Sequence, residues 1–161
     1  MANFLDKVQP KNKAQLKSLI EYAFNHNIYD LNFIDTSKIT NMSNLFMNCE
    51  YDIDVSNWDV SNVTTTFCMF VGCKKFNSDL SNWNMANVKT AGYMFIGCES
   101  FEGKGLENWD VSKIKDIHSM FYRCKKLNCD LSDWDVSFVS HFGWTFYRCD
   151  KMTIPDWYDK L

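Results

Sequence analysis

Hydrophobic and polar positions repeat along most of the chain with a spacing of 25 or 26 residues between successive tryptophans. Phenylalanine and cysteine keep the same period. Self-similarity at a fixed period of this length is typical of proteins that stack one supersecondary unit on the next. We therefore expect a solenoid that buries its apolar side chains between successive repeats. The repeated positions are Trp58, Trp83, Trp109 and Trp134; Phe46, Phe70, Phe95, Phe121 and Phe146; and Cys49, Cys73, Cys98, Cys124 and Cys149.

The hydrophobic period changes within each repeat. The first half, as in Leu106, Trp109 and Val111, ends in the alternation that a half-buried strand requires. The second half places apolar residues at i, i+3, i+4 and i+7, which predicts one buried face of a helix of about two turns. We therefore expect an α/β repeat of about five rungs, with the strands in a parallel sheet and the helices in a second layer.

Both ends of the solenoid are expected to be covered. An amphipathic stripe over residues 10–27 predicts a helix that shields the first rung. Near the other end, Trp157 holds the tryptophan position and Pro155 prevents further ladder pairing. We expect one structural domain, made of an N-terminal capping helix in 1–30, solenoid repeats in 31–154 and a C-terminal cap in 155–161.

Composition places the chain among ordered globular proteins. Hydrophobic residues make up 46% of the 161 residues and the formal net charge is only −3. This mild acidity makes nucleic acid an unlikely partner, and no apolar run approaches the roughly 20 residues of a membrane helix. The N-terminal residues lack the basic and apolar pattern of a secretory signal. We expect a cytoplasmic monomer, or a surface protein whose signal has been removed.

Cysteine and histidine give no pattern that indicates chemistry. Free cysteine is among the most buried residue types, so five stacked thiols are interpreted as core. Cys68 and Cys129 lie off this column and complete no zinc spacing. His26, His118 and His141 join no nucleophile or metal motif. We expect no enzyme activity, no cofactor and no metal ion.

An acidic column is one candidate surface. One residue in each strand segment lies between two buried positions, and it is an aspartate in most repeats, including Asp59, Asp110 and Asp135. In one interpretation these carboxylates form a ladder of turns, each accepting hydrogen bonds from nearby Ser, Asn or backbone donors. In the other they form an acidic strip that binds a basic or polar partner. The sequence leaves both open.

A second candidate surface precedes the repeated cysteine. Its residues are apolar or neutral in the early repeats and become Tyr122-Arg123 and Tyr147-Arg148 in the later ones. Tyrosine and arginine are enriched at the residues that dominate binding energy in protein interfaces. A solvated charged face is the structural alternative.

The last full repeat departs most from the pattern. Phe138 and Trp144 fall at outward positions by register. They predict an aromatic contact patch beside the second Tyr-Arg pair. The alternative is that they pack beneath the C-terminal Trp157-Tyr158 and close the core.

The repeated segments also resemble a known family. Trp-Asp-Val-Ser-Asn-Val, then Met-Phe-x-x-Cys, then Phe-Asn-x-Asp-Leu-Ser-Asn-Trp closely resembles the BspA-like leucine-rich-repeat family, which is also described from Mycoplasma surface proteins. The resemblance runs from Leu31 to about Thr153. It implies a right-handed leucine-rich-repeat-like solenoid. Family members are mostly cell-surface or secreted proteins linked to adhesion, and no catalytic residues transfer to this chain.

We therefore expect a non-enzymatic protein-interaction module that binds a macromolecular partner, a protein, through one face of the solenoid. One version is a phage- or mobile-element-encoded inhibitor of a host defence protein, acting in the host cytoplasm. The alternative is a surface adhesin fragment of the BspA-like family. The candidate partner-binding residues are Tyr122, Arg123, Tyr147, Arg148, Trp144, Phe138, Asp59, Asp110 and Asp135.

Overall fold

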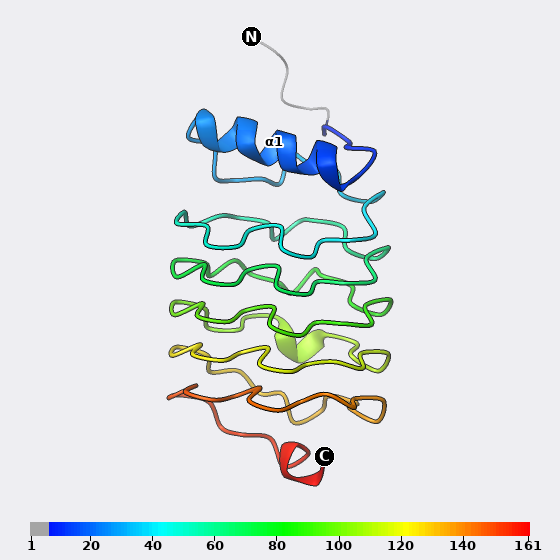
Figure 1. Cartoon of the computed structure of the whole chain (residues 1–161), viewed down its shortest axis with the longest axis vertical. Coiled ribbons are helices and arrows are strands. Elements are labelled where there is room, and N and C mark those ends of the chain that lie inside the picture. The colour runs from blue at the N-terminus through cyan, green and yellow to red at the C-terminus, as the bar shows by residue number, and fades with distance from the viewer. Residues whose placement is uncertain (1–6) are drawn as a thin grey trace.

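The chain runs in successive coils that stack along the longest axis of the molecule (Figure 1). This computed structural model describes residues 7–161, so the first six residues of the predicted capping segment 1–30 lie outside the described residues. We use "coil" for the stretch from one bridge residue to the next, and "last coil" for the stretch that follows the last bridge residue, His141. Isolated parallel bridges join each coil to the next, pairing Asn41 with Thr65, Thr65 with Thr90, Thr90 with Asp116, and Asp116 with His141.

The expected fold class is wrong. Among the described residues the only α-helix is α1 (Lys13–Asn25), and two short 3-10 helices follow, η1 (Leu106–Asn108) and η2 (Tyr158–Lys160). Extended structure in residues 7–161 is confined to isolated bridges, and no sheet forms. The chain is therefore not an α/β, leucine-rich-repeat-like solenoid of about five rungs with a parallel strand and a short helix in each.

The segments that the sequence predicted as helices fold as turns bonded to the next coil. Tyr93 N donates to His118 O at 2.8 Å, and Phe95 N donates to Met120 O at 2.9 Å. The amide between them, Met94 N, donates to the carbonyl three residues earlier. Successive amides thus alternate between a hydrogen bond to the next coil and a hydrogen bond within a turn. Because backbone donors are satisfied in this way, the i→i−4 bonds of a helix do not form.

At two equivalent positions in each coil the backbone is left-handed, which interrupts any helix. In one coil they are Tyr93, with φ of 61°, and Gly97, with φ of 70°. A left-handed conformation costs an L-residue about 1–2 kcal/mol, so it occurs singly and not in helical runs. The equivalent residues in the other coils are Asn44 and Asn48, Cys68 and Gly72, Ser119 and Arg123, and Trp144 and Arg148.

Columns of like side chains fill the core, and this prediction is confirmed. The rings of Phe70 and Phe95 stack at 5.4 Å, and those of Trp83 and Trp109 stack at 6.3 Å. Cys98 Sγ donates to Phe70 O at 3.1 Å. Five of the six indoles, all except that of Trp144, also donate to a carbonyl of the preceding coil. These pairs are Trp58 with Leu31, Trp83 with Val55, Trp109 with Leu80, Trp134 with Leu106, and Trp157 with Leu131.

Different elements cover the two ends of the stack (Figure 1). Helix α1 begins after Asn12, whose side-chain oxygen accepts from Gln15 N at 3.0 Å, and it buries Leu16 and Ile20 against the first coil. It is shorter than the helix predicted over residues 10–27. At the opposite end Trp157 stacks on the tryptophan column, 6.2 Å from Trp134, and precedes η2.

Candidate functional site

The acidic column is built into the turns of the coils. Asp59 accepts from Ser61 N at 2.9 Å, and Asp110 accepts from both the amide and the hydroxyl of Ser112, at 3.0 and 2.6 Å. The Ser112 hydroxyl lowers the pKa of the Asp110 carboxyl below its ordinary value, and the Ser112 amide adds to this effect. Asp135 is bonded to Ser137 in the same way. These carboxylates therefore stabilise turns, as the first of the two interpretations expects.

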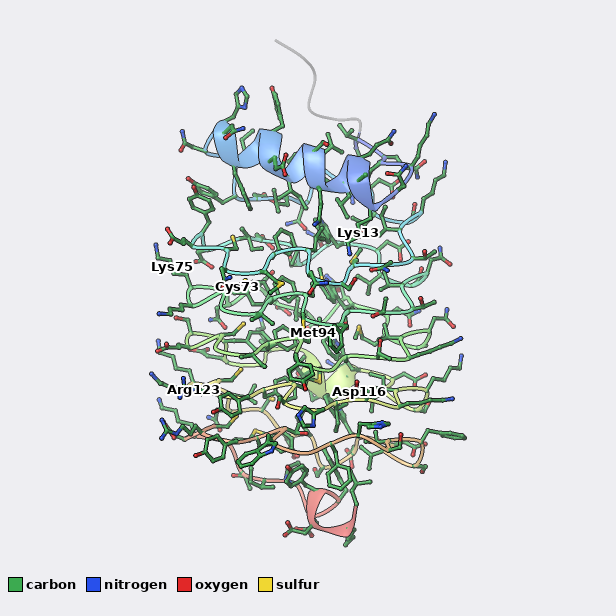
Figure 2. The ribbon with its side chains drawn as sticks, in the orientation of Figure 1. Lys13, Cys73, Lys75, Met94, Asp116 and Arg123 are labelled. Atoms are coloured by element: carbon green, nitrogen blue, oxygen red, sulfur yellow. The ribbon has the colours of Figure 1, made fainter. Side chains whose placement is uncertain are left out.

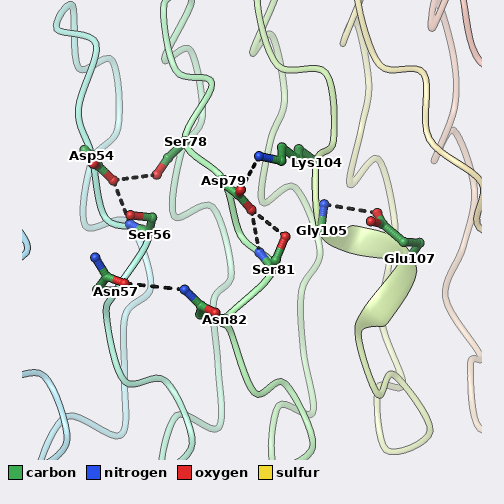
Figure 3. A network of polar contacts seen from close by, with 10 residues as sticks. All are labelled: Asp54, Ser56, Asn57, Ser78, Asp79, Ser81, Asn82, Lys104, Gly105 and Glu107. Carbon is green, nitrogen blue, oxygen red and sulfur yellow. Dashed lines mark hydrogen bonds and ion pairs between the residues drawn. The ribbon is translucent and has the colours of Figure 1, made fainter.

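A second set of aspartate turns lies four residues before Trp58, Trp83 and Trp134, and sequence reasoning missed it (Figure 3). Asp79 accepts from Ser81 N at 3.0 Å and pairs with Lys104 Nζ at 2.5 Å. The hydrogen bond from Lys104, together with those from the Ser81 hydroxyl and amide, lowers the pKa of Asp79 to about 2. In the preceding coil Asp54 accepts from Ser56 N and from the Ser78 hydroxyl. The recurring Asp-x-Ser spacing was the signal that could have revealed these turns.

The two Tyr-Arg pairs form one continuous surface. The rings of Tyr122 and Tyr147 stack with their centroids 5.1 Å apart. Each arginine lies over the ring of the tyrosine that precedes it. The guanidinium carbon of Arg123 is 5.4 Å from the centre of the Tyr122 ring, and that of Arg148 is 5.7 Å from the centre of the Tyr147 ring. Trp144 packs edge-on against Tyr147 at 5.0 Å. We call these five residues the Tyr–Arg surface.

The Tyr–Arg surface is open to solvent. Trp144 is 58% exposed and Tyr147 is 41% exposed. The Arg123 and Arg148 side chains are also exposed, and neither forms an ion pair with any of residues 7–161. Figure 2 shows Arg123 on the same side of the stack as Lys75. The surface therefore combines flat aromatic area with two exposed positive charges that form no ion pair within residues 7–161.

The comparisons with known proteins identify a family. Residues 14–105 and 93–158 match the family described as "Mycoplasma protein of unknown function, DUF285". The chain belongs to the DUF285 family. No curated protein and no solved structure matches it significantly. The second matched range of this DUF285 chain contains the whole Tyr–Arg surface.

The backbone of the DUF285 chain is strained where the two arginines lie. Arg123 has φ of 62° and Arg148 has φ of 58°, whereas glycine holds the equivalent position in two earlier coils, at Gly72 and Gly97. Trp144, at the other left-handed position of its coil, has φ of 64°. Glycine adopts this conformation without steric cost, so the fold alone does not call for arginine or tryptophan there.

Phe138 does not join this surface. It is 66% exposed and lies in the turn closed by the bond from Val139 N to Val136 O. Among the described residues no aromatic contact links it to Trp144. Neither side chain packs beneath the C-terminal segment, where Phe142 instead contacts Tyr158 at 6.0 Å. The expected patch of Phe138 with Trp144 is therefore replaced by Trp144 with Tyr147.

Charges beside the repeated cysteine alternate in sign along the stack. Lys74, Glu99, Lys125 and Asp150 follow successive cysteines, and Lys125 Nζ pairs with Glu99 at 2.7 Å. This column balances itself. Lys75, Lys126 and Lys151 lie one residue further on and, like Arg123 and Arg148, form no ion pair within residues 7–161, so this edge of the stack remains basic.

The cysteine thiols of residues 7–161 are free but not activated. Burial raises the pKa of the Cys73 thiol to about 12, and all seven cysteines are free. Residues 7–161 contain no group of three His, Cys, Asp or Glu that could hold a metal ion. Within the same range, no helix has the length and apolar character needed to cross a bilayer.

Proposed function

We propose that this protein is a non-enzymatic interaction module that binds a partner protein through the Tyr–Arg surface. The observation that carries the proposal is a pair of exposed arginines, Arg123 and Arg148, which form no ion pair within residues 7–161 and occupy left-handed positions where two earlier coils use glycine. Strained residues that the fold does not require are found preferentially at functional sites.

The composition and geometry of the surface support the same proposal. Tyrosine, tryptophan and arginine are the residue types that carry most binding energy in protein interfaces. Stacking of Tyr122 on Tyr147, and of Trp144 against Tyr147, holds the rings in place before a partner arrives. Preorganised side chains lose less conformational entropy on binding, so more of the contact energy contributes to affinity.

The acidic column is less suited to bind a partner than the Tyr–Arg surface is. Asp59, Asp110 and Asp135 each accept a hydrogen bond within a turn, so their carboxylates have less capacity left for a partner. Phe138 is exposed but isolated from the other aromatic rings. We expect these four residues to contribute less to binding than Arg148 and Tyr147 do.

An adhesin fragment is the second candidate function. Membership in a family described from Mycoplasma supports it, because the resemblance to BspA-like repeats links such sequences to surface adhesion. The same Tyr–Arg surface would then bind a protein on another cell. Partner capture from two samples, surface proteins of intact cells and a cytosolic extract, separates the two candidates. An adhesin fragment should capture its partner from the surface sample.

The test removes the arginines without disturbing the fold. In the Arg123→Gly, Arg148→Gly variant, glycine relieves the backbone strain, so the free energy of unfolding should stay unchanged or rise by up to about 1 kcal/mol per site. Capture of the partner, measured by cross-linking and mass spectrometry against wild type, should fall at least tenfold.

The matched control is Lys89→Ala, Lys115→Ala, which removes two exposed positive charges away from the Tyr–Arg surface. This control should capture the same partner as wild type. Equal capture by wild type and the double-glycine variant would overturn the proposed function, since the arginines would then be ordinary solvated charges.

A further inference from the structure

The last coil leaves a row of backbone donors without acceptors. In the preceding coil, four alternate amides donate to carbonyl oxygens of the last coil at 2.8 to 3.0 Å. The equivalent amides of the last coil find no backbone acceptor among residues 7–161. The four donors of the preceding coil are Ile117, Ser119, Phe121 and Arg123, and their equivalents in the last coil are Phe142, Trp144, Phe146 and Arg148.

This row, which we call the donor edge, offers hydrogen-bond donors and almost no acceptors. The carbonyls of Gly143, Thr145 and Tyr147 accept from the preceding coil and therefore point back into the stack. The carbonyls of Phe142 and Trp144 accept within turns, from Thr145 N and Tyr147 N. Aligned backbone N–H groups create a positive potential that favours anions and carbonyl oxygens.

The C-terminal segment packs beside the donor edge without satisfying it. Trp157 and Tyr158 contact the ring of Phe146 at 5.8 and 5.2 Å. The Tyr158 hydroxyl donates to the carbonyl oxygen of Phe142 at 3.4 Å. This bond occupies an acceptor of the last coil and none of its amide donors. The segment therefore closes the apolar core while the amides of Trp144 and Arg148 keep no partner.

A second copy of this chain does not complement the donor edge. The matching acceptors would lie on the first coil, but α1 covers that end, where Lys13 Nζ donates to Ser43 O and Leu16 is fully buried. Two donor edges that face each other would present donors to donors and almost no acceptors. The occupant must therefore be a different chain that presents carbonyl or carboxylate oxygens.

We propose that the donor edge binds an extended acidic segment of a partner protein, which adds to the stack as one more coil would. Backbone carbonyls of the segment would accept from the donor edge, and its carboxylates would face Arg148 and Lys151. Trp144 and Tyr147 would supply flat contact area at the same end of the stack. This inference rests on the proposed function and names the partner class and the mode of binding.

The test compares two synthetic peptides that differ only in charge. One alternates glutamate with threonine over eight residues, and the other alternates lysine with threonine. Amide hydrogen exchange is followed by NMR on the full chain with each peptide in excess. The acidic peptide should slow exchange of the Trp144 and Arg148 amides at least tenfold. The Thr145 and Tyr147 amides, already bonded within turns, should change little.

Three results would overturn the inference. The first is the absence of slowing with the acidic peptide, and the second is equal slowing with both peptides. The third is concentration-dependent dimerisation in sedimentation that itself protects the donor edge, because the occupant would then be a second copy. The Arg148→Gly variant keeps the backbone amide at position 148 and should bind the acidic peptide at least tenfold more weakly. This variant therefore distinguishes the contribution of the guanidinium to binding from that of the amide.

Failure of this inference is distinguishable from failure of the proposed function. If partner capture depends on Arg123 and Arg148 but the acidic peptide leaves the donor-edge amides unprotected, only the inference fails. If capture is independent of the two arginines, the proposed function fails whatever the peptides do.

Discussion

Trp109 donates its indole Nε1 to the carbonyl oxygen of Leu80 at 3.2 Å, joining two successive coils. The ring is 4% exposed and stacks between Trp83 and Trp134. Trp109→Ala removes both the packing and the hydrogen bond, so the free energy of unfolding should fall by about 3–5 kcal/mol. Urea unfolding followed by circular dichroism measures this loss.

The conservative variant Trp109→Phe separates the two contributions. It keeps much of the buried ring but leaves Leu80 O without its donor. The expected loss is about 1–3 kcal/mol, smaller than for alanine. If phenylalanine destabilised the protein as much as alanine does, burial of the ring would not be the main contribution.

Buried thiols should make the protein sensitive to alkaline pH. Burial raises the pKa of Cys73 and Cys149 to about 12, from the ordinary 9.0. The unfolded chain then loses these protons first, so the free energy of unfolding falls as pH rises from about 9 to 12, by up to about 1.4 kcal/mol per pH unit for each thiol. The slope should be shallower in Cys73→Ala, and parallel pH curves for the two proteins would contradict the assignment.

The aspartate turns should contribute stability that is lost in acid. The pKa of Asp110 lies below its ordinary 3.8, chiefly because the Ser112 hydroxyl donates to its carboxylate. A lowered pKa in the folded state stabilises the protein above pH 3.8, and this contribution disappears as the pH falls through the folded value. In Ser112→Ala, carboxyl titration by NMR should show the Asp110 pKa move upward. An unchanged value would show that the hydroxyl has no effect.

Two glycines with left-handed backbone should respond differently to alanine. At Gly97 the nearest atom to an added Cβ is 3.8 Å away, so Gly97→Ala should cost only the left-handed penalty of about 1–2 kcal/mol. At Gly105 the Cβ would lie 2.2 Å from Ser81 N. This overlap should add at least about 1–3 kcal/mol in Gly105→Ala. Similar melting temperatures for the two variants would contradict the close approach of these coils.

The stacking of like residues could be predicted from the sequence, but the local structure could not. Tryptophans at a constant spacing indicate a column whatever backbone carries them. Spacing i, i+3, i+4 and i+7 does not identify a helix in the same way, because Ala91, Met94 and Phe95 reach the core equally well from a series of turns. Left-handed positions are evident where glycine holds them, but Tyr93 and Arg123 give no such signal.

In the candidate site, too, the sequence predicted the exposure of the residues but not the contacts between them. Register alone placed Trp144 and Tyr147 at the surface, and both are exposed. Their mutual contact could not be predicted, because it depends on the left-handed backbone at Trp144. The aspartate column was correctly located, yet its bonds to serine within the turns were only one of two interpretations until the structure placed the donors.

The central claim is that alternate amides bond each coil to the next and leave those of the last coil free. Amide hydrogen exchange of the unbound protein tests it most directly. The account predicts slow exchange at Ser119, Arg123 and Tyr147, and fast exchange at Trp144 and Arg148. Uniform protection of the last coil, as helical i→i−4 bonds would give, would contradict both the architecture and the donor edge.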